Sequence, residues 1–125
     1  MPEWGELQVD QLRYMARNYG AEIAYRNLDA ATSITFAEWD AESNRMARGL
    51  SALGIGKGDR VSIYLPSEEV LHWIVAYAAI HKAGAVVVPT NTRLSARELE
   101  TVLGHAEIVA MITCDALVER AEEAR

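Results

Sequence analysis

Hydrophobic positions along the chain follow two periods, a helical spacing near 3.6 residues and the shorter spacing typical of strands. The first helical stretch ends at Gly20, where a helix C-terminus favours a glycine with positive φ. Its apolar positions are Val9, Leu12, Met15, Ala16 and Tyr19. Residues 22–28 then alternate, with Ile23 and Tyr25 on one face, and predict a strand. A polar turn over residues 29–33 and a return strand from Ile34 complete a predicted β-hairpin.

A second helix is predicted directly after the hairpin. Thr35 and Glu38 have the spacing of a capping box, in which the threonine hydroxyl accepts from a helical amide and the glutamate reaches back. Gly54 closes this helix. Its apolar stripe consists of Phe36, Trp39, Met46, Ala47, Leu50 and Leu53.

The glycine-rich residues 54–60, GIGKGDR, invite comparison with a phosphate-binding loop. Such a loop needs Ser or Thr after its Gly-Lys pair, and it lies after a strand and before a helix. Here Gly58 follows Lys57, and the segment lies after a helix and before a strand. The pattern therefore predicts a helix end followed by a tight turn.

Residues 61–65 predict a strand that Pro66 ends, with Ser67 as a helix cap. The helix expected over residues 67–83 is apolar almost all round, so it must be covered on both sides. Gly84 stops it. The β-branched run at residues 85–88 then indicates a parallel strand buried on two faces.

The last third of the chain repeats the alternation of strand and helix. Ser95 and Glu98 form a second capping box, for a helix to about residue 103. A third buried strand is expected over residues 108–113, and a last helix from about Asp115. From Val61 onward the order is βαβαβ, whose crossovers are right-handed. The predicted fold is α/β: a three-layer arrangement of a parallel sheet flanked by helices, preceded by the hairpin.

Two features indicate that residues 1–125 form a single, incomplete domain. Three parallel strands make a narrow sheet with two unprotected edges. The apolar helix over residues 67–83 also requires more cover than the other predicted elements supply. The missing cover is expected from the remainder of a longer chain or from a partner chain.

Composition narrows the possible partners and compartment. The chain has 125 residues, half of them hydrophobic, with 12 Lys and Arg against 18 Asp and Glu. A net charge of -6 argues against nucleic acid or an anionic membrane as a partner. The apolar run at residues 70–80 is too short to span a membrane, and no signal peptide is recognised at the N-terminus. Cys114, the single cysteine, fits a half-buried small hydrophobe in a reducing compartment, so a soluble, cytoplasmic protein is expected.

No residue pattern indicates a nucleophile with its base or a metal site, so no catalytic residue and no metal ligand is predicted. His81 is expected to interact with the last carbonyls of its helix, and His105 is expected to lie at a helix end. The acidic residues 68–69 and 119–123 read as a helix start and a solvated helix face.

Five segments in register carry a resemblance to a known family. They are ITFAE at residues 34–38, SNRMARGL at 43–50, GIGKGDRV at 54–61, LP at 65–66 and KAGAVVVPTNTRL at 82–94. In this order they resemble the N-terminal region of AMP-forming acyl-CoA synthetases, members of the adenylate-forming ligases, over roughly residues 9–113. The resemblance implies a larger multi-layer αβαβα N-terminal domain, of which this chain is part.

The resemblance also implies a two-step reaction. A carboxylate such as a fatty acid attacks ATP with Mg²⁺ to give an acyl-adenylate, and coenzyme A then displaces AMP. In this family the phosphate loop, the ribose-binding Asp and the catalytic lysine lie in later segments, so the 125 residues alone are expected to be inactive scaffold. Arg93 corresponds to a loop position that reaches a CoA phosphate in some CoA ligases. His72 and Trp73 are candidates for contact with the acyl substrate, with core packing as the alternative.

Other functions remain open at this point. The chain is alternatively a non-catalytic, truncated relative that binds a partner, or part of an aryl-CoA ligase or of a peptide-synthetase adenylation domain. A third alternative is an independent nucleotide-binding domain of the doubly wound type. That fold wants a glycine-rich turn between a strand and its helix, and residues 65–67 and 89–95 lack one.

Overall fold

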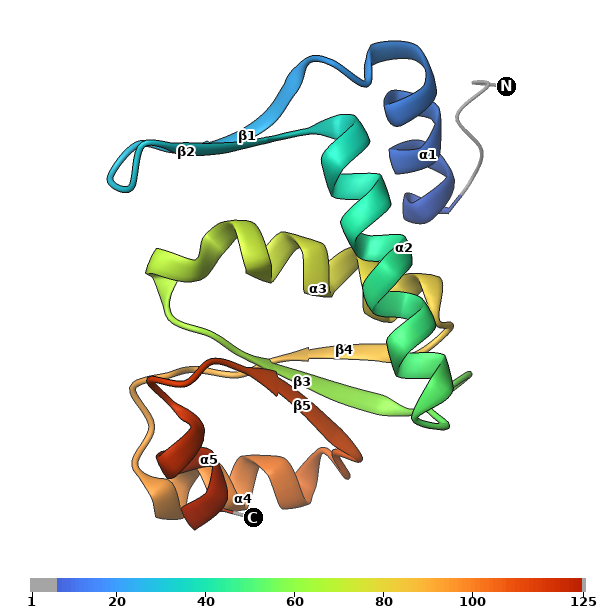
Figure 1. Cartoon of the computed structure of the whole chain (residues 1–125). Helices are drawn as coiled ribbons and strands as arrows, with labels where there is room; N and C mark the ends of the chain where they lie inside the picture. Colours follow the sequence, from blue (N-terminus) through green and yellow to red (C-terminus); the bar gives the residue numbers. More distant parts are fainter. Residues whose placement is uncertain (1–6, 125) are drawn as a thin grey trace.

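The central strand of a three-stranded parallel sheet organises the fold (Figure 1). The computed structural model describes residues 7–124. Strand β3 (Arg60–Tyr64) lies between β4 (Val86–Pro89) and β5 (Ala110–Thr113). Val61 is paired with Val87 on one side and with Ala110 on the other. Because it has neighbours on both sides and helices on both faces, β3 is the most deeply buried strand.

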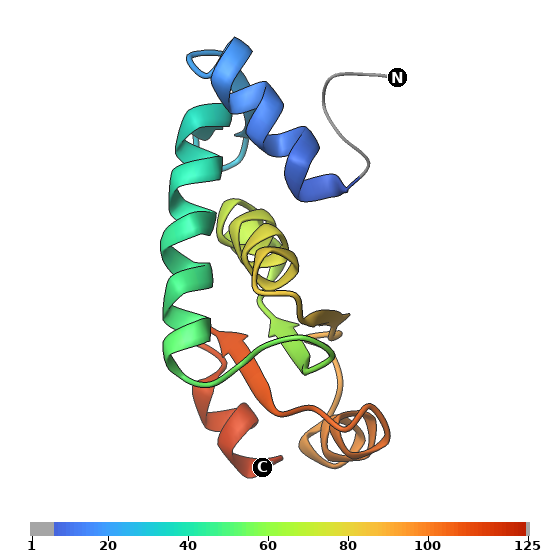
Figure 2. The ribbon, with the colours of Figure 1, turned by 90° about the vertical axis from the view of Figure 1, so that its right-hand side faces the viewer.

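Helices cover both faces of this sheet, which confirms the predicted three-layer α/β fold (Figures 1 and 2). Helices α2 (Phe36–Ala52) and α3 (Val70–Lys82) lie on one side, and α4 (Ala96–His105) and α5 (Val118–Glu123) lie on the other. Successive side chains of a strand point to opposite faces. Accordingly Val61 and Ile63 belong to the core beneath α3, while Tyr64 packs with Leu99 beneath α4 and α5.

The N-terminal elements form an additional layer beyond α3 (Figure 1). Helix α1 (Gln8–Tyr19) precedes an antiparallel hairpin of β1 (Ile23–Asn27) and β2 (Thr32–Thr35), and β2 leads directly into α2. The hairpin is confirmed, but its return strand begins at Thr32, two residues before the predicted Ile34. The turn is correspondingly shorter than the polar segment suggested.

Both predicted capping boxes are present. The Glu38 amide donates to Thr35 Oγ1 at 3.1 Å, and the Thr35 amide donates to Glu38 Oε1 at 3.0 Å. Ser95 and Glu98 make the same reciprocal pair at the start of α4. The predicted helix end at Gly54 is also confirmed, with φ of 87°.

The prediction of a positive φ at Gly20 is wrong. Gly20 has φ of -57°, an ordinary helical value. A glycine is required at position 20 for a different reason. A Cβ atom there would collide with the carbonyl oxygen of Ala16 and lie 3.2 Å from Ala37 Cβ. The residue allows α1 to approach the start of α2 closely.

The predicted cap at Ser67 is also wrong. Residues Ser67–Glu69 form a short 3₁₀ turn, η1, and no side chain among residues 7–124 caps either this turn or α3. The Pro66 carbonyl accepts from the Glu69 amide at 3.0 Å, so the turn itself starts the helix. Backbone hydrogen bonds therefore replace the expected serine cap.

The strands β4 and β5 are not buried on two faces as their apolar sequences suggested. Within residues 7–124 the sheet has three strands, so both lie at edges, and Val86 of β4 is 45% exposed. The third strand begins at Ala110 rather than residue 108, since Val109 is exposed in the preceding turn. Only β3 matches the predicted burial.

The apolar helix α3 is covered more fully than the sequence suggested. It lies on the sheet with α2 packed along its flank, and α1 and the hairpin lie beyond it (Figures 1 and 2). The buried residues of α3 are Ile74, Val75, Ala76, Ala78, Ala79 and Ile80. One stripe, formed by Trp73, Tyr77 and His81, remains half-buried. The expectation of too little cover was thus wrong for most of the helix, and α2 and α1 are the reason. None of the helices among residues 7–124 is both apolar enough and long enough to cross a bilayer.

Candidate functional site

The loop after β4 lies at the edge of the sheet where the parallel strands end, the usual place for ligands in α/β folds. The buried hydroxyls of Ser62 and Thr90 anchor its start, 2.6 Å apart, and Thr90 also donates to the Val88 carbonyl. Asn91 Oδ1 accepts from the Arg93 amide at 2.9 Å and shapes the turn. The loop is therefore fixed at its base and internally bonded.

Arg93 is exposed at the tip of this loop. Its guanidinium makes no ion pair with any acidic residue among residues 7–124. The side chain is free to meet an anion at this edge.

His72 and Trp73 are adjacent in sequence but occupy different environments on α3. The His72 side chain is 75% exposed, and its Nδ1 atom lies 2.5 Å from Glu69 Oε2. Trp73 is half-buried and stacks on Tyr77, with ring centroids 5.4 Å apart. The helical rotation of about 100° per residue separates the two candidates.

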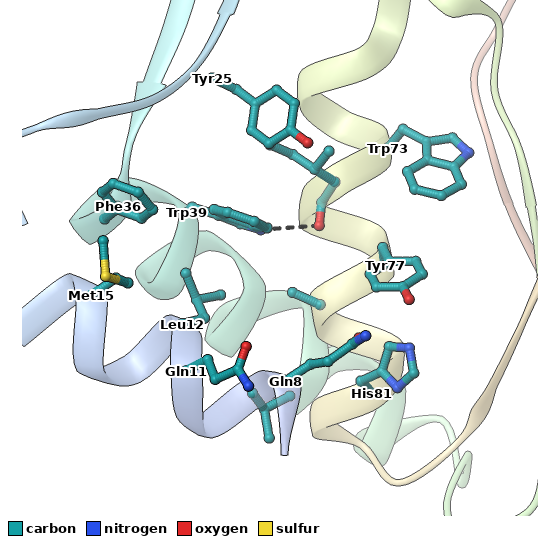
Figure 3. A pocket seen from close by; sticks show the side chains of 13 residues that line it. Gln8, Gln11, Leu12, Met15, Tyr25, Phe36, Trp39, Trp73, Tyr77 and His81 are labelled. Carbon is teal, nitrogen blue, oxygen red and sulfur yellow. Dashed lines mark hydrogen bonds between the residues drawn. The ribbon is translucent and has the colours of Figure 1, made fainter. Parts of the chain in front are cut away.

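Trp73 contributes to a hollow between α1, the hairpin, the start of α2 and one flank of α3 (Figure 3). Its volume is about 400 Å³. The Trp39 indole at its upper end donates to the Ile74 carbonyl at 3.0 Å and meets the Tyr25 ring edge-to-face. We call this space the α1–α3 hollow; its lining is Gln8, Val9, Gln11, Leu12, Met15, Tyr25, Phe36, Trp39, Trp73, Ile74, Tyr77, Ala78 and His81.

The sequence interpretation did not assign Tyr77 or His81 to a site with Trp73. The three rings follow one another at intervals of four residues, and the Tyr77 and His81 rings are 4.7 Å apart. Residues four apart lie on one face of a helix. That spacing was the available signal for a continuous aromatic stripe.

Lys82, at the end of α3, is the centre of a buried polar cluster that the sequence did not indicate. Its side chain is 8% exposed, and its ammonium donates to Asp40 Oδ1 at 2.6 Å. It also donates at 2.8 Å to Ser43 Oγ and to Asn44 Oδ1. Because all of these acceptors belong to α2, the hydrogen bonds of the cluster link α3 to α2.

Glu38 and Cys114 are two further ionisable residues, and both make contacts within the fold. The backbone amide of Thr35, and next its hydroxyl, hold the pKa of Glu38 below its ordinary value of 4.5. Cys114 is half-buried against the core beneath α3, as expected. No cluster of three or more His, Cys, Asp or Glu side chains among residues 7–124 is arranged to hold a metal ion.

The glycine-rich turn is used internally, in agreement with its interpretation as a helix end and tight turn. Asp59 Oδ2 accepts from the Gly56 amide at 2.8 Å, and the Gly58 amide donates to the Gly84 carbonyl at 3.2 Å. Gly58 has φ of 84°, a value that favours glycine. These amides therefore hold the α2–β3 connection.

A family model described as AMP-binding enzyme matches residues 12–125, most of the chain. The chain belongs to this family. The family comprises AMP-forming acid–CoA ligases, which use ATP and coenzyme A. The resemblance found in the sequence motifs is thereby confirmed.

Curated relatives of the chain include CoA ligases. A methyl-dioxo-octahydro-indenyl propanoyl:CoA ligase of Mycobacterium tuberculosis is 50% identical over 98 residues, which are 78% of the chain and 18% of the relative. The long-chain-fatty-acid–CoA ligase FadD13 of the same species is 40% identical over 80 residues, which are 64% of the chain and 16% of the relative.

Solved structures agree with these matches. Coronafacic acid ligase from Pectobacterium brasiliense superposes with a TM-score of 0.82 at 30% identity, covering 92% of the chain and 22% of the ligase. A benzoate CoA ligase from Burkholderia xenovorans gives 0.83 at 25% identity, covering 93% and 23%. The chain thus spans less than a quarter of each of these relatives and matches the N-terminal part of the adenylate-forming domain.

Proposed function

We propose that this chain is the N-terminal part of the large domain of an ATP-dependent, AMP-forming carboxylate–CoA ligase. The observation that carries the proposal is the family match over residues 12–125. A fatty acid is the preferred substrate class, and an aryl carboxylate or the substrate of a peptide-synthetase adenylation domain is the alternative. The lone cysteine supports a cytoplasmic location.

The reaction defines what this segment has to supply. As the carboxylate approaches ATP, negative charge on the phosphates must be neutralised, a task for Mg²⁺, a lysine and backbone amides. Amides of the glycine-rich turn donate hydrogen bonds within the chain, and the Lys82 ammonium donates to residues of α2. We therefore assign the 125 residues a scaffold role, with no adenylate formation by the chain alone.

A chimera tests this function directly. The chain would replace the matching segment of the 50% identical ligase of Mycobacterium tuberculosis. Expected results are pyrophosphate release and CoA-thioester formation by the chimera, and neither by the chain alone. A folded chimera that binds ATP but makes no thioester from either its natural acid or a fatty acid panel contradicts the proposal. Turnover by the isolated chain contradicts the scaffold role.

Arg93 is proposed to contact a phosphate of coenzyme A. Its exposed position at the carboxyl-terminal edge of the sheet and its lack of an acidic partner within residues 7–124 support this role. In the chimera, Arg93→Ala should raise the KM for CoA by about tenfold with little change for ATP, the effect of one charge-assisted hydrogen bond. The control is Arg97→Ala, an exposed arginine in α4. An unchanged KM for CoA removes the role.

A partner-binding module is the second candidate. The half-buried aromatic stripe of α3 and the exposed Val86 on the β4 edge favour the docking of further polypeptide. The genomic reading frame beyond residue 125 separates the two candidates. A following phosphate loop supports the ligase, and an immediate stop codon supports the module.

His72 and Trp73 are also proposed to contact the substrate. The lining position of Trp73 supports a contact with an apolar group. The exposure of His72 restricts it to the outer surface of α3, beside Glu69.

A further inference from the structure

The α1–α3 hollow has the size and composition of a small-molecule site. Its volume of about 400 Å³ falls within the range of ligand pockets, roughly 300–1,000 Å³. Aromatic rings from three elements line it, among them Trp39 on α2 and Trp73 and Tyr77 on α3. Trp39 is fixed by its hydrogen bond to the Ile74 carbonyl, so this part of the lining is preformed.

Polar groups gather at one end of the hollow. Figure 3 shows Gln8, Gln11 and His81 at the end formed by the start of α1 and the last turn of α3, with Tyr25 and Phe36 at the opposite end. The side chains of Gln8, Gln11 and His81 make no hydrogen bond to any other residue among 7–124. Both amide groups and either tautomer of the imidazole offer N–H donors.

The charge of the lining favours an anionic head over a cationic one. None of the lining residues is acidic, although the chain carries a net charge of -6. A carboxylate placed between the Gln8 amide and the His81 ring would meet donors and no like charge. Its apolar body would then extend along the Trp73 and Tyr77 rings toward Tyr25.

We infer that the α1–α3 hollow binds a carboxylic acid with a medium-length aliphatic or an aromatic body. The head group is held by Gln8 and His81, and the body by the Trp73–Tyr77 wall. The inference rests on the proposed function to the extent that acids of this class are the substrates of a carboxylate–CoA ligase. It adds a site on α1 and α3 that contains none of the groups needed for adenylate formation.

Calorimetric titration of the 125-residue chain with decanoate and with decanol tests the site without ATP or CoA. Saturable binding of decanoate is expected, at least tenfold tighter than binding of decanol, because only the carboxylate uses the free donors. His81→Leu should weaken decanoate binding about tenfold and leave decanol unchanged. The matched control is His105→Leu, an exposed histidine on α4 outside the hollow.

Three outcomes of the titrations of the isolated chain overturn the inference. They are the absence of saturable decanoate binding, equal affinity for decanoate and decanol, and an effect of His105→Leu as large as that of His81→Leu. Circular dichroism of each variant shows that it is folded, and Gln8→Leu provides a second, exposed position on α1 should His81→Leu unfold. Decanoate binding by the chain but not by a folded chimera means that polypeptide occupies the hollow, which also overturns the inference. Binding by the chain and failure of the chimera to make thioesters would separate this site from the proposed function.

Discussion

Replacing Lys82 by methionine should strongly destabilise the fold, because it removes one partner of a buried ion pair. Methionine keeps the length of the side chain and removes its charge and donors. The Asp40 carboxylate, whose side chain is 19% exposed, then loses the ammonium 2.6 Å away. Ser43, which is fully buried, loses a hydrogen bond as well.

The magnitude follows from this geometry. Breaking a buried ion pair by removing one partner costs about 3–5 kcal/mol. Because Asp40 keeps some contact with solvent, we expect a loss of about 3 kcal/mol in the free energy of unfolding. Whole domains have only about 5–15 kcal/mol. For a chain of this size the loss lowers Tm by roughly 10 °C.

Urea denaturation followed by tryptophan fluorescence and circular dichroism measures the effect. The control is Arg45→Met, since the Arg45–Glu42 pair has side chains 70% and 49% exposed and should contribute less than about 0.5 kcal/mol. The double variant Asp40→Leu/Lys82→Met should recover most of the loss, because no buried charge is left without a partner. A decrease of less than about 1 kcal/mol for Lys82→Met, or one no larger than that of Arg45→Met, refutes the reasoning.

Three further changes test other parts of the structure. Because the pKa of Glu38 is lowered in the folded state, its contribution to stability is complete above its unfolded pKa of about 4.5 and is lost as the pH falls through the folded value. The difference in stability between wild type and Glu38→Gln should therefore shrink between roughly pH 6 and pH 2. Thr35→Ala should raise the pKa of Glu38 in an NMR titration. Tyr64→Phe should leave stability unchanged or raise it by about 1 kcal/mol, since the buried Tyr64 hydroxyl has no hydrogen-bond partner within residues 7–124, and a loss above about 1 kcal/mol in urea denaturation contradicts this. Gly20→Ala should destabilise by about 1–3 kcal/mol because its Cβ meets the Ala16 carbonyl, and an unchanged Tm would show that α1 can move away.

Parts of the candidate site were predictable because they depend on local order. The position of Arg93 at the carboxyl-terminal edge follows from the strand before it and the capping box after it. The placement of Trp73 on an apolar helix follows from periodicity. The separation of His72 from Trp73 is also a helical property, although it takes the surrounding elements to decide which of the two faces the hollow.

Other features depend on distant segments meeting. Lys82 and Asp40 are 42 residues apart, and no local pattern marks one as the partner of the other. Gln8 and His81 come to one end of the hollow only because α1 lies across α3. The edge position of β4 likewise depends on the number of strands in the sheet, which its β-branched composition does not encode.

The sequence by itself determined the order of helices and strands, both capping boxes, the glycine turn at residues 54–60 and the family. These properties rest on interactions between residues a few positions apart, whose spacing is visible in the chain. Only the tertiary structure decided that β3 is the most deeply buried strand among residues 7–124, that α2 and α1 cover α3, that Lys82 pairs with Asp40 and that the α1–α3 hollow exists. Those properties arise from packing between elements far apart in sequence, and packing depends on the position of every layer at once.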